Sequence, residues 1–169
     1  MKGTIVKCLE EVVQKLGGDA AWKKTLTAAG QDAARVFITT EDVPDADVVA
    51  MIGHAAETLG VSTQAAMDAF GEHWSTEYAP RLYKVYFDRA SNVREFLLNM
   101  AKVHETVTRR MANARPPVFT YDDSAPDALV MTYGSDRGLA ALMPGLIHGA
   151  AKYYGETVDV NRSATECTS

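Results

Sequence analysis

His104 is the residue in this sequence whose surroundings best suit a metal-bearing cofactor. In a helix spanning residues 92–114, its neighbours three and four positions away include Met100, Val107 and Thr108, so the imidazole lies beside an apolar stripe. A heme iron needs one neutral imidazole nitrogen, with hydrocarbon covering the porphyrin faces. His104 is therefore a candidate heme ligand. A partly buried histidine that hydrogen-bonds a carbonyl is the alternative interpretation of His104 on its own.

Tyr133, Ser135 and Arg137 form a second candidate group, at the end of an expected strand. Alternate residues of an extended backbone share a face, so the sequence predicts two hydroxyls and a guanidinium that point the same way. These donors suit carboxylates, because arginine forms bidentate pairs and hydroxyls add directed hydrogen bonds. Heme carries two propionates besides its iron, so this group and His104 would hold both parts of one cofactor. Ordinary polar residues at a strand end are the alternative interpretation.

The remaining histidines, His54, His73 and His148, do not fall into a hydrolytic or zinc-binding motif. Neither HxxxH nor HExxH spacing occurs, which disfavours a zinc hydrolase. The sequence also lacks the GxSxG element of serine hydrolases and the glycine-rich loops GxGxxG and GxxxxGK[ST] of nucleotide-binding proteins. No catalytic residues are assigned, and we do not expect an enzyme.

Composition and charge favour a globular protein that needs neither nucleic acid nor membrane insertion. The 169 residues are 47% hydrophobic with a formal net charge of −5, which suits a single domain with a full core. No lysine and arginine cluster is large enough to neutralise a run of phosphates. No apolar stretch approaches the roughly 20 residues that cross a bilayer, and residues 1–7 lack the long apolar core of a signal peptide. Two cysteines, Cys8 and Cys167, cannot form a disulfide framework, so we expect a cytoplasmic protein.

Apolar residues at helical spacing predict that the first two thirds of the chain are helical. The expected helices span residues 5–16, 19–30, 45–59, 62–79 and 92–114. Gly17-Gly18 is expected to stop the first helix, and Asp45 to cap the third. The fourth should end before Pro80, and Arg115-Pro116-Pro117 should end the helix of His104, because proline lacks a backbone donor and restricts the preceding residue.

After the double proline the apolar pattern changes to that of strands. The expected elements are strands over residues 118–121 and 128–133 and a helix over residues 139–154. Pro144 should kink this helix or delay its start. Val158 and Val160 predict the beginning of a third strand that has no partner after it, so we expect either an irregular end or a chain cut from a longer protein.

Together these elements predict an α+β fold in one domain over residues 1–169. A helical N-terminal lobe, residues 1–114, precedes a C-terminal lobe, residues 115–169, with a small antiparallel sheet and a long helix. Because His104 belongs to the first lobe and the Tyr133 group to the second, we expect heme to be buried between the lobes.

Six elements of the sequence occur in the order found in one known family. They are the opening MKGTIV, FGEHW at residues 70–74, His104 in its helix, RPP at 115–117, YxSxRGL at 133–139 and GLIHG at 145–149. On these elements the chain resembles the H-NOX domain, the heme nitric oxide/oxygen-binding module of bacterial gas sensors and soluble guanylate cyclase. The resemblance covers nearly the whole chain. The family's C-terminal hairpin normally has a further strand, so this hairpin looks truncated.

The resemblance implies that His104 is the proximal ligand of a b-type heme iron. It implies that Tyr133, Ser135 and Arg137 hold the propionates and that Pro117 packs on the porphyrin and distorts it. The side where gas binds, the distal side, would be lined by four apolar or aromatic residues: Ile5, Trp74, Leu142 and Leu146.

The residue at position 142 bears on which gas is bound. Oxygen-binding members of the family carry a tyrosine in the helix after the propionate motif, and here that position is Leu142. Bound dioxygen gains more from a hydrogen-bond donor than nitric oxide does, so we expect a sensor of nitric oxide that binds carbon monoxide and forms no stable complex with dioxygen. This expectation requires that the polar hydrogens of Trp74 and Tyr78 do not point at the ligand. Pro144 could also shift Leu142 and Leu146.

In the resembling family the signal arises when nitric oxide breaks the bond to the proximal histidine. The output then passes to a histidine kinase, a cyclic-di-nucleotide enzyme or a chemotaxis receptor, fused or separate. Two alternatives are a heme-free helical interaction module with a collapsed pocket and a heme peroxidase. A peroxidase needs a polar distal group, for which His73 is the candidate in this sequence.

Overall fold

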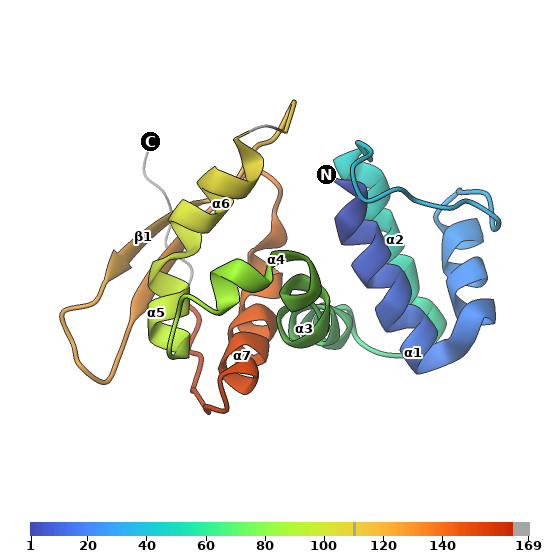
Figure 1. The fold of residues 1–169 in the computed structure, drawn as a ribbon. Coiled ribbons are helices and arrows are strands. Elements are labelled where there is room, and N and C mark those ends of the chain that lie inside the picture. The colour runs from blue at the N-terminus through green and yellow to red at the C-terminus, as the bar shows by residue number, and fades with distance from the viewer. Residues whose placement is uncertain (110, 164–169) are drawn as a thin grey trace.

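The computed structural model describes residues 1–109 and 111–163, so Cys167 lies outside the described residues (Figure 1). The elements in chain order are α1 (Gly3–Ala28), α2 (Asp45–Leu59), α3 (Thr63–His73), the π-helical turn η1 (Trp74–Tyr78), α4 (Ala79–Phe87), α5 (Val93–Leu98), α6 (Met100–Thr108), β1 (Val118–Asp122), β2 (Val130–Gly134), the 3₁₀ turn η2 (Leu139–Leu142) and α7 (Met143–Tyr153). The predicted combination of a mainly helical chain, a small antiparallel sheet and a C-terminal helix is confirmed.

Helices α1 and α2 pack against each other. The break predicted at Gly17-Gly18 is a kink inside α1, where Gly18 has φ 76° and ψ 177°. Helix α2 ends as expected, because Gly60 adopts the left-handed conformation with φ 68°. Asp45 is not the N-cap that the sequence predicts: Pro44 precedes the helix, and Asp45 is its first residue. Its carboxylate has long-range partners instead.

Helix α3 continues into α4 through the π-helical turn η1. Ser62 caps α3 as predicted, since its side chain accepts a hydrogen bond from Ala65 N at 3.1 Å. The expected stop before Pro80 is wrong. Pro80 lies in the first turn of α4, where its missing N–H and fixed φ are tolerated, and the wide π turn before it lets the chain remain helical.

Helices α3 and α7 approach each other along glycines. A Cβ atom on Gly71 would lie 2.5 Å from the backbone nitrogen of Leu146, and one on Gly145 would lie 2.7 Å from Cα of Asp68. No side chain fits at these contacts, so the two backbones touch directly. This contact fixes α7 against η1 as well, because Ser75 donates a hydrogen bond to Leu146 O at 2.9 Å.

The helix predicted over residues 92–114 is two shorter helices. Asn92 caps α5 by accepting a hydrogen bond from Glu95 N at 2.8 Å. Asn99 separates α5 from α6, and α6 ends at Thr108 rather than at the prolines. Every described residue of α6 is at least partly exposed, so few tertiary contacts hold this helix.

The two predicted strands form an antiparallel hairpin in which Val118 pairs with Gly134 and Asp122 with Val130. The third strand predicted at Val158 and Val160 is wrong, because residues 156–163 form no strand. Val158 packs on an apolar cluster instead, next to the aromatic rings of Phe87 and Phe96. Pro144 delays α7 as expected: residues 139–142 form a 3₁₀ turn, and the α-helix begins at Met143.

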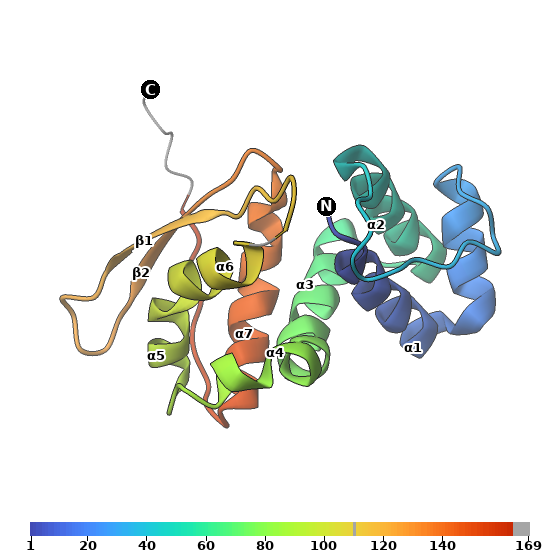
Figure 2. The ribbon, with the colours of Figure 1, turned by 45° about the horizontal axis from the view of Figure 1, so that its top comes forward.

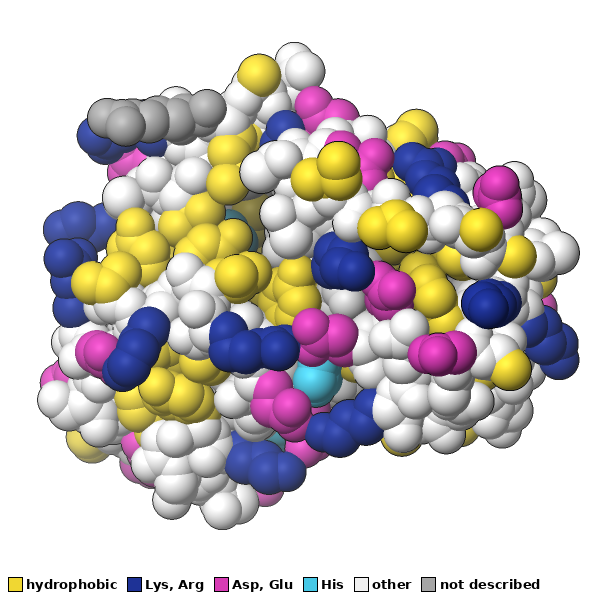
Figure 3. All heavy atoms as spheres, turned by 45° about the vertical axis from the view of Figure 1, so that its right-hand side comes forward, with side chains coloured by type: hydrophobic (Ala, Val, Ile, Leu, Met, Phe, Trp, Pro, Cys, Tyr) yellow, Lys and Arg dark blue, Asp and Glu magenta, His cyan; other side chains and the backbone are white. Residues whose placement is uncertain are grey.

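Figures 1 and 2 show how the elements are arranged. Helices α1 and α2 lie on one side of the molecule, the hairpin with α5 and α6 on the other, and α3, α4 and α7 between them. The spatial grouping therefore does not follow the chain boundary at the double proline, because α6 packs with β1. On the face shown in Figure 3, positive and negative side chains are interspersed. None of the helices in the described part of the chain has the length and apolar character needed to cross a membrane.

Candidate functional site

His104 lies on α6 with its ring against the hairpin. The centroid of its ring is 5.4 Å from that of Phe119, the second residue of β1. Burial lowers the pKa of His104, so the imidazole is neutral at neutral pH. A neutral imidazole has a free lone pair for a metal ion. The structure therefore keeps His104 in the protonation state that ligation requires.

The described residues contain no group of three or more histidine, cysteine, aspartate or glutamate side chains arranged to hold a metal ion. His104 is thus not part of a cluster of three such ligands among the described residues. An ion bound here needs its other ligands from a prosthetic group, as iron has in a porphyrin. This isolated histidine fits heme better than it fits a protein-bound zinc or magnesium site.

A groove of about 390 Å³ runs beside the helix of His104. Ala101 and Thr108 line it from α6, and Pro117 and Phe119 line it from the other side. His104 itself does not line the groove, but its ring lies on Phe119. The structure therefore brings Pro117 to the same neighbourhood as His104.

The Tyr133 group is not an extended face, as its alternating spacing predicted. Strand β2 ends at Gly134, and Ser135 Oγ accepts a hydrogen bond from Arg137 N at 3.3 Å, which bends the chain. The Tyr133 ring remains 5.6 Å from Phe119. Phe119 thus lies between His104 and the first residue of this group.

Arg137 points across to the start of α2. Its Nε donates a hydrogen bond to Asp45 Oδ2 at 3.1 Å, and its side chain is mostly buried. Within the part of the chain that the structure describes, Nη1 and Nη2 of Arg137 have no hydrogen-bond partner. Two nitrogens of the guanidinium are therefore available to donate to a carboxylate.

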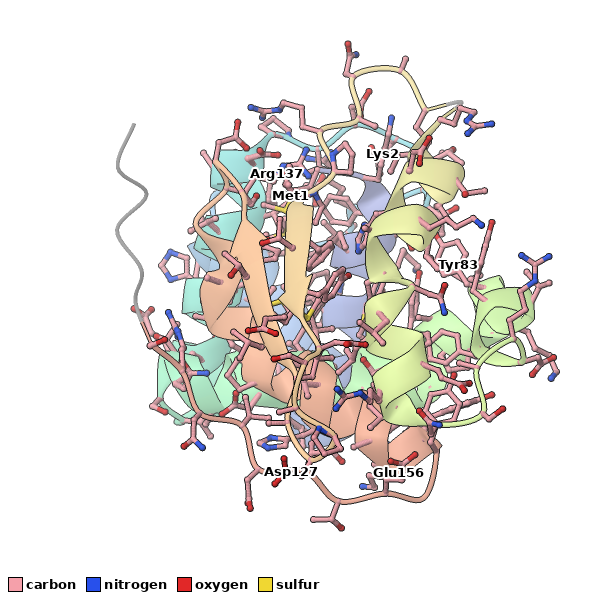
Figure 4. All side chains as sticks on the ribbon, turned by 90° about the vertical axis from the view of Figure 1, so that its left-hand side faces the viewer. Met1, Lys2, Tyr83, Asp127, Arg137 and Glu156 are labelled. Atoms are coloured by element: carbon pink, nitrogen blue, oxygen red, sulfur yellow. The ribbon has the colours of Figure 1, made fainter. Side chains whose placement is uncertain are left out.

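Asp45 collects three positive groups. It binds the amino terminus of Met1 through Oδ1, and Arg115 at 3.0 Å and Arg137 through Oδ2. Figure 4 shows Met1 and Arg137 close together. Arg115 also binds Asp136 at 2.5 Å. The hydrogen bond from the amino terminus is the main cause that lowers the pKa of Asp45. Three cations against two carboxylates leave one positive charge, which suits a bound propionate.

The four residues expected on the distal side lie together. Leu142 is buried in one apolar cluster, and Ile5, Trp74 and Leu146 pack against it. We call this set the Leu142 cluster. Leu142 is 6% exposed, and the Trp74 ring stacks on Tyr78 at 5.4 Å. Pro144 therefore does not separate Leu142 from its expected neighbours.

His73 belongs to a different environment. Its Nε2 lies 2.9 Å from Glu11, and its Nδ1 lies 3.6 Å from Glu77. Arg81 also binds Glu11. Burial acts to raise the pKa of Glu11, but hydrogen bonds from His73 and Arg81 outweigh it and lower that pKa. His73 thus forms part of an ion network between α1 and η1, which does not suit a distal acid–base group.

Comparison with known proteins shows the family and the fold of this chain. The family model described as Haem-NO-binding matches residues 2–162. The chain belongs to this family, the H-NOX domains. The fold has been solved in relatives that cover nearly all of this chain.

Three solved H-NOX structures illustrate the likeness. An oxygen-binding H-NOX domain related to soluble guanylate cyclases, solved as its oxygen complex, is 27% identical, with a TM-score of 0.82 over 98% of this chain and 89% of that one. The I5F mutant of the T. tengcongensis H-NOX is 26% identical, with a TM-score of 0.86 over 98% and 91%. An S. oneidensis H-NOX protein in its Fe(II)NO state is 19% identical, with a TM-score of 0.86 over 97% and 91%, and shows the shared fold.

Asp45 and Arg115 were not predicted from the sequence as partners of Arg137. Arg137 and Arg115 both bind Asp45, although Asp45 and Arg137 lie 92 positions apart. No local sequence pattern indicates this pairing, because it depends on how the fold places the start of α2 relative to the segment after β2.

Proposed function

We propose that this H-NOX domain binds heme b with His104 as the iron ligand and acts as a cytoplasmic sensor of nitric oxide. The observation that carries the proposal is the position of Phe119, whose ring contacts both His104 and Tyr133. A neutral iron ligand and a carboxylate-binding group thus flank one aromatic side chain. Tyr133, Ser135 and Arg137 would hold the propionates, and Pro117 would press on the porphyrin.

The proposed gas selectivity depends on the Leu142 cluster. Leu142 offers no hydrogen-bond donor, and Ile5 and Leu146 beside it offer none. Dioxygen becomes strongly polarised when bound and needs a donor, whereas nitric oxide and carbon monoxide need one less. We infer that nitric oxide and carbon monoxide bind and that dioxygen forms no stable complex.

When bound, heme would supply the iron that nitric oxide and His104 bind, and the proposed signal is the release of His104 from that iron. The protein's part is to convert release of His104 into movement. Helix α6 can move because its described residues are exposed or only partly buried and Asn99 interrupts the helix before it. Asn99 would act as the hinge, so that α6 swings without α5.

Helix α5 is held in place while α6 moves. Arg94 donates hydrogen bonds to three carbonyls of the hairpin turn: Ala128 at 2.9 Å, Ala125 at 2.7 Å and Asp123 at 3.2 Å. Glu156 accepts a hydrogen bond from Val93 N at 3.0 Å. A partner that prefers one position of α6 would read the change. Such a partner would be a histidine kinase, a cyclic-di-nucleotide enzyme or a chemotaxis receptor, and the domain itself would not be an enzyme.

Absorption spectra of the reduced protein test the proposal. Supplied with heme, the folded protein should show a five-coordinate ferrous spectrum that changes to a five-coordinate nitrosyl spectrum with nitric oxide. Exposure to air should give no long-lived oxy spectrum. A folded protein that takes up no heme would contradict the proposed cofactor, and a stable oxy spectrum would contradict the proposed selectivity.

A further inference from the structure

Helix α6, which carries His104, has no side-chain cap from its own segment. Asn99 precedes the helix, but its backbone is helical and its side chain accepts no hydrogen bond from the first turn. Ala101 is the second residue of α6, so its N–H has no acceptor within this helix. The first turn of α6 therefore needs a partner from outside the helix.

The hydroxyl of Tyr121, in strand β1, is such a partner. Ala101 N donates a hydrogen bond to Tyr121 Oη at 3.3 Å, across 20 positions of the sequence. The Tyr121 ring stacks on Phe119 with a centroid distance of 6.5 Å and an interplanar angle of 15°. Burial raises the pKa of Tyr121, so the phenol keeps its proton at neutral pH. A strand side chain thus caps the helix of the proposed iron ligand.

This contact lies at the hinge end of α6, next to Asn99. Helix α6 packs along β1 (Figure 1), and the two run in opposite directions. Tyr121 contacts Ala101, and Phe119, two residues earlier in β1, lies against His104, three residues later in α6. Beyond His104, the helix faces the groove of about 390 Å³. The Tyr121 contact is therefore one helical turn before the iron ligand.

We propose that Tyr121 is a positioning residue, which caps α6 at Ala101 and so restrains His104 when it binds the iron. The inference rests on the heme function proposed above. With its first turn held to β1, α6 cannot slide along the strand, and His104 keeps its position beside Phe119. After release of His104, the helix turns about the Tyr121 contact, so the end beyond His104 moves further than the end beside Asn99.

Tyr121→Phe tests the cap, because it removes the hydroxyl and keeps the ring on Phe119. In the heme-free protein, hydrogen exchange of the Ala101 amide should become about two- to tenfold faster, as expected for the loss of one hydrogen bond. An unchanged exchange rate would show that Tyr121 does not hold the first turn of α6.

The iron–histidine stretch in resonance Raman spectra of the ferrous, heme-loaded protein tests the restraint. A His104→Gly protein rescued with imidazole gives the frequency of a ligand that no helix restrains. In Tyr121→Phe the stretch should move from the wild-type value toward that frequency. Adding Tyr121→Phe to the rescued His104→Gly protein should change nothing, because its ligand is not joined to α6. A stretch that does not move toward the rescued value, or an equal shift in the rescued protein, would overturn the proposal.

Tyr154→Phe is the matched control. The Tyr154 hydroxyl donates to Phe87 O at 2.7 Å, so this variant removes a long-range hydrogen bond that links the end of α7 to α4 instead of reaching α6. It should leave both the Ala101 exchange rate and the iron–histidine stretch at their wild-type values. A wild-type protein that takes up no heme would reject the underlying function. The exchange measurement needs no heme and would still test the cap, so the two failures are distinguishable.

Discussion

Nε of Arg137 donates a hydrogen bond to Oδ2 of Asp45 at 3.1 Å, which ties the segment after the hairpin to the first turn of α2. The side chain of Arg137 is 19% exposed and that of Asp45 29%, so solvent screens the pair only in part. Met1 and Arg115 add their charges to the same carboxylate. Asp45 thus connects the N-terminal helices with the segment that follows β2.

Asp45→Asn should lower stability at neutral pH and lose its effect in acid. The amino terminus of Met1 and then Arg137 hold the pKa of Asp45 below its ordinary value. A depressed folded-state pKa contributes stability above the unfolded pKa of about 3.9, and this contribution disappears as pH falls through the folded value. Partial exposure limits the effect to about 1 kcal/mol, or roughly 2–4 °C in the unfolding midpoint of the heme-free protein at pH 7.

The control for this variant is Asp88→Asn, which removes the same charge from an exposed pair within one helix. The unfolding midpoint of this variant at pH 7 should change less than that of Asp45→Asn. Lys84 and Asp88 are only four residues apart at the end of α4, so their ion pair connects no distant parts of the chain. An Asp45→Asn protein that is equally destabilised at pH 7 and below pH 2 would show that the carboxylate charge is not the cause.

Gly71→Ala should destabilise the domain by about 1–3 kcal/mol, as overpacking does in well-packed cores. The new methyl group would meet backbone atoms of Gly145 and Leu146, which cannot rotate away. Urea unfolding measures the loss. Gly53→Ala, inside α2 with no atom within 4 Å of the new Cβ, should raise stability by about 0.5–1 kcal/mol. If both variants changed the free energy of unfolding equally, the close contact between α3 and α7 would not be the cause of the loss in Gly71→Ala.

The features that local chemistry controls were predictable from the sequence. Ser62 and Asn92 cap their helices, and Gly60 ends α2, because each interaction involves residues within one turn. Pro144 delays α7 for the same local reason. The expectation that a helix ends before proline was wrong at Pro80. The π turn that precedes Pro80 changes the local backbone path, so the proline ring is accommodated in the first turn of α4.

Features that depend on distant partners were not predictable. Aspartate is a residue type that often caps helices, but Asp45 instead forms ion pairs with three groups that are distant in the sequence. Val158 and Val160 alternate as in a strand, yet the side chain of Val158 packs on an apolar cluster that is formed mainly by helices. For the site, the resemblance to H-NOX domains named residues that belong to one apolar core with Leu142, whereas the contact between Thr4 and Tyr78 depends on the positions of α1 and η1.

Arg94→Ala should loosen the hairpin turn without releasing α6. The guanidinium donates to three carbonyls between residues 123 and 128, so its loss leaves the turn without its tie to α5. Hydrogen exchange of amides in residues 122–129 should become faster, because the turn opens more often. Arg89→Ala removes an exposed arginine that lies over Tyr86 and should leave these amides unchanged. Unchanged exchange in Arg94→Ala would mean that the strands alone order the turn.

His104→Gly should abolish heme retention, and added imidazole should restore it. Glycine removes the neutral imidazole that α6 presents beside Phe119 but leaves the Tyr133 group in place, so free imidazole can take the vacant position. The heme Soret absorbance after gel filtration, with and without imidazole, measures this. His54→Gly makes the same change on α2, where the histidine hydrogen-bonds Glu57, and should keep its heme. Both substitutions carry the helix cost of glycine, about 1 kcal/mol, so heme loss in His104→Gly that imidazole restores reports the loss of an iron ligand. A His104→Gly protein with the spectrum and heme content of wild type in the absence of imidazole would assign the ligand to another residue.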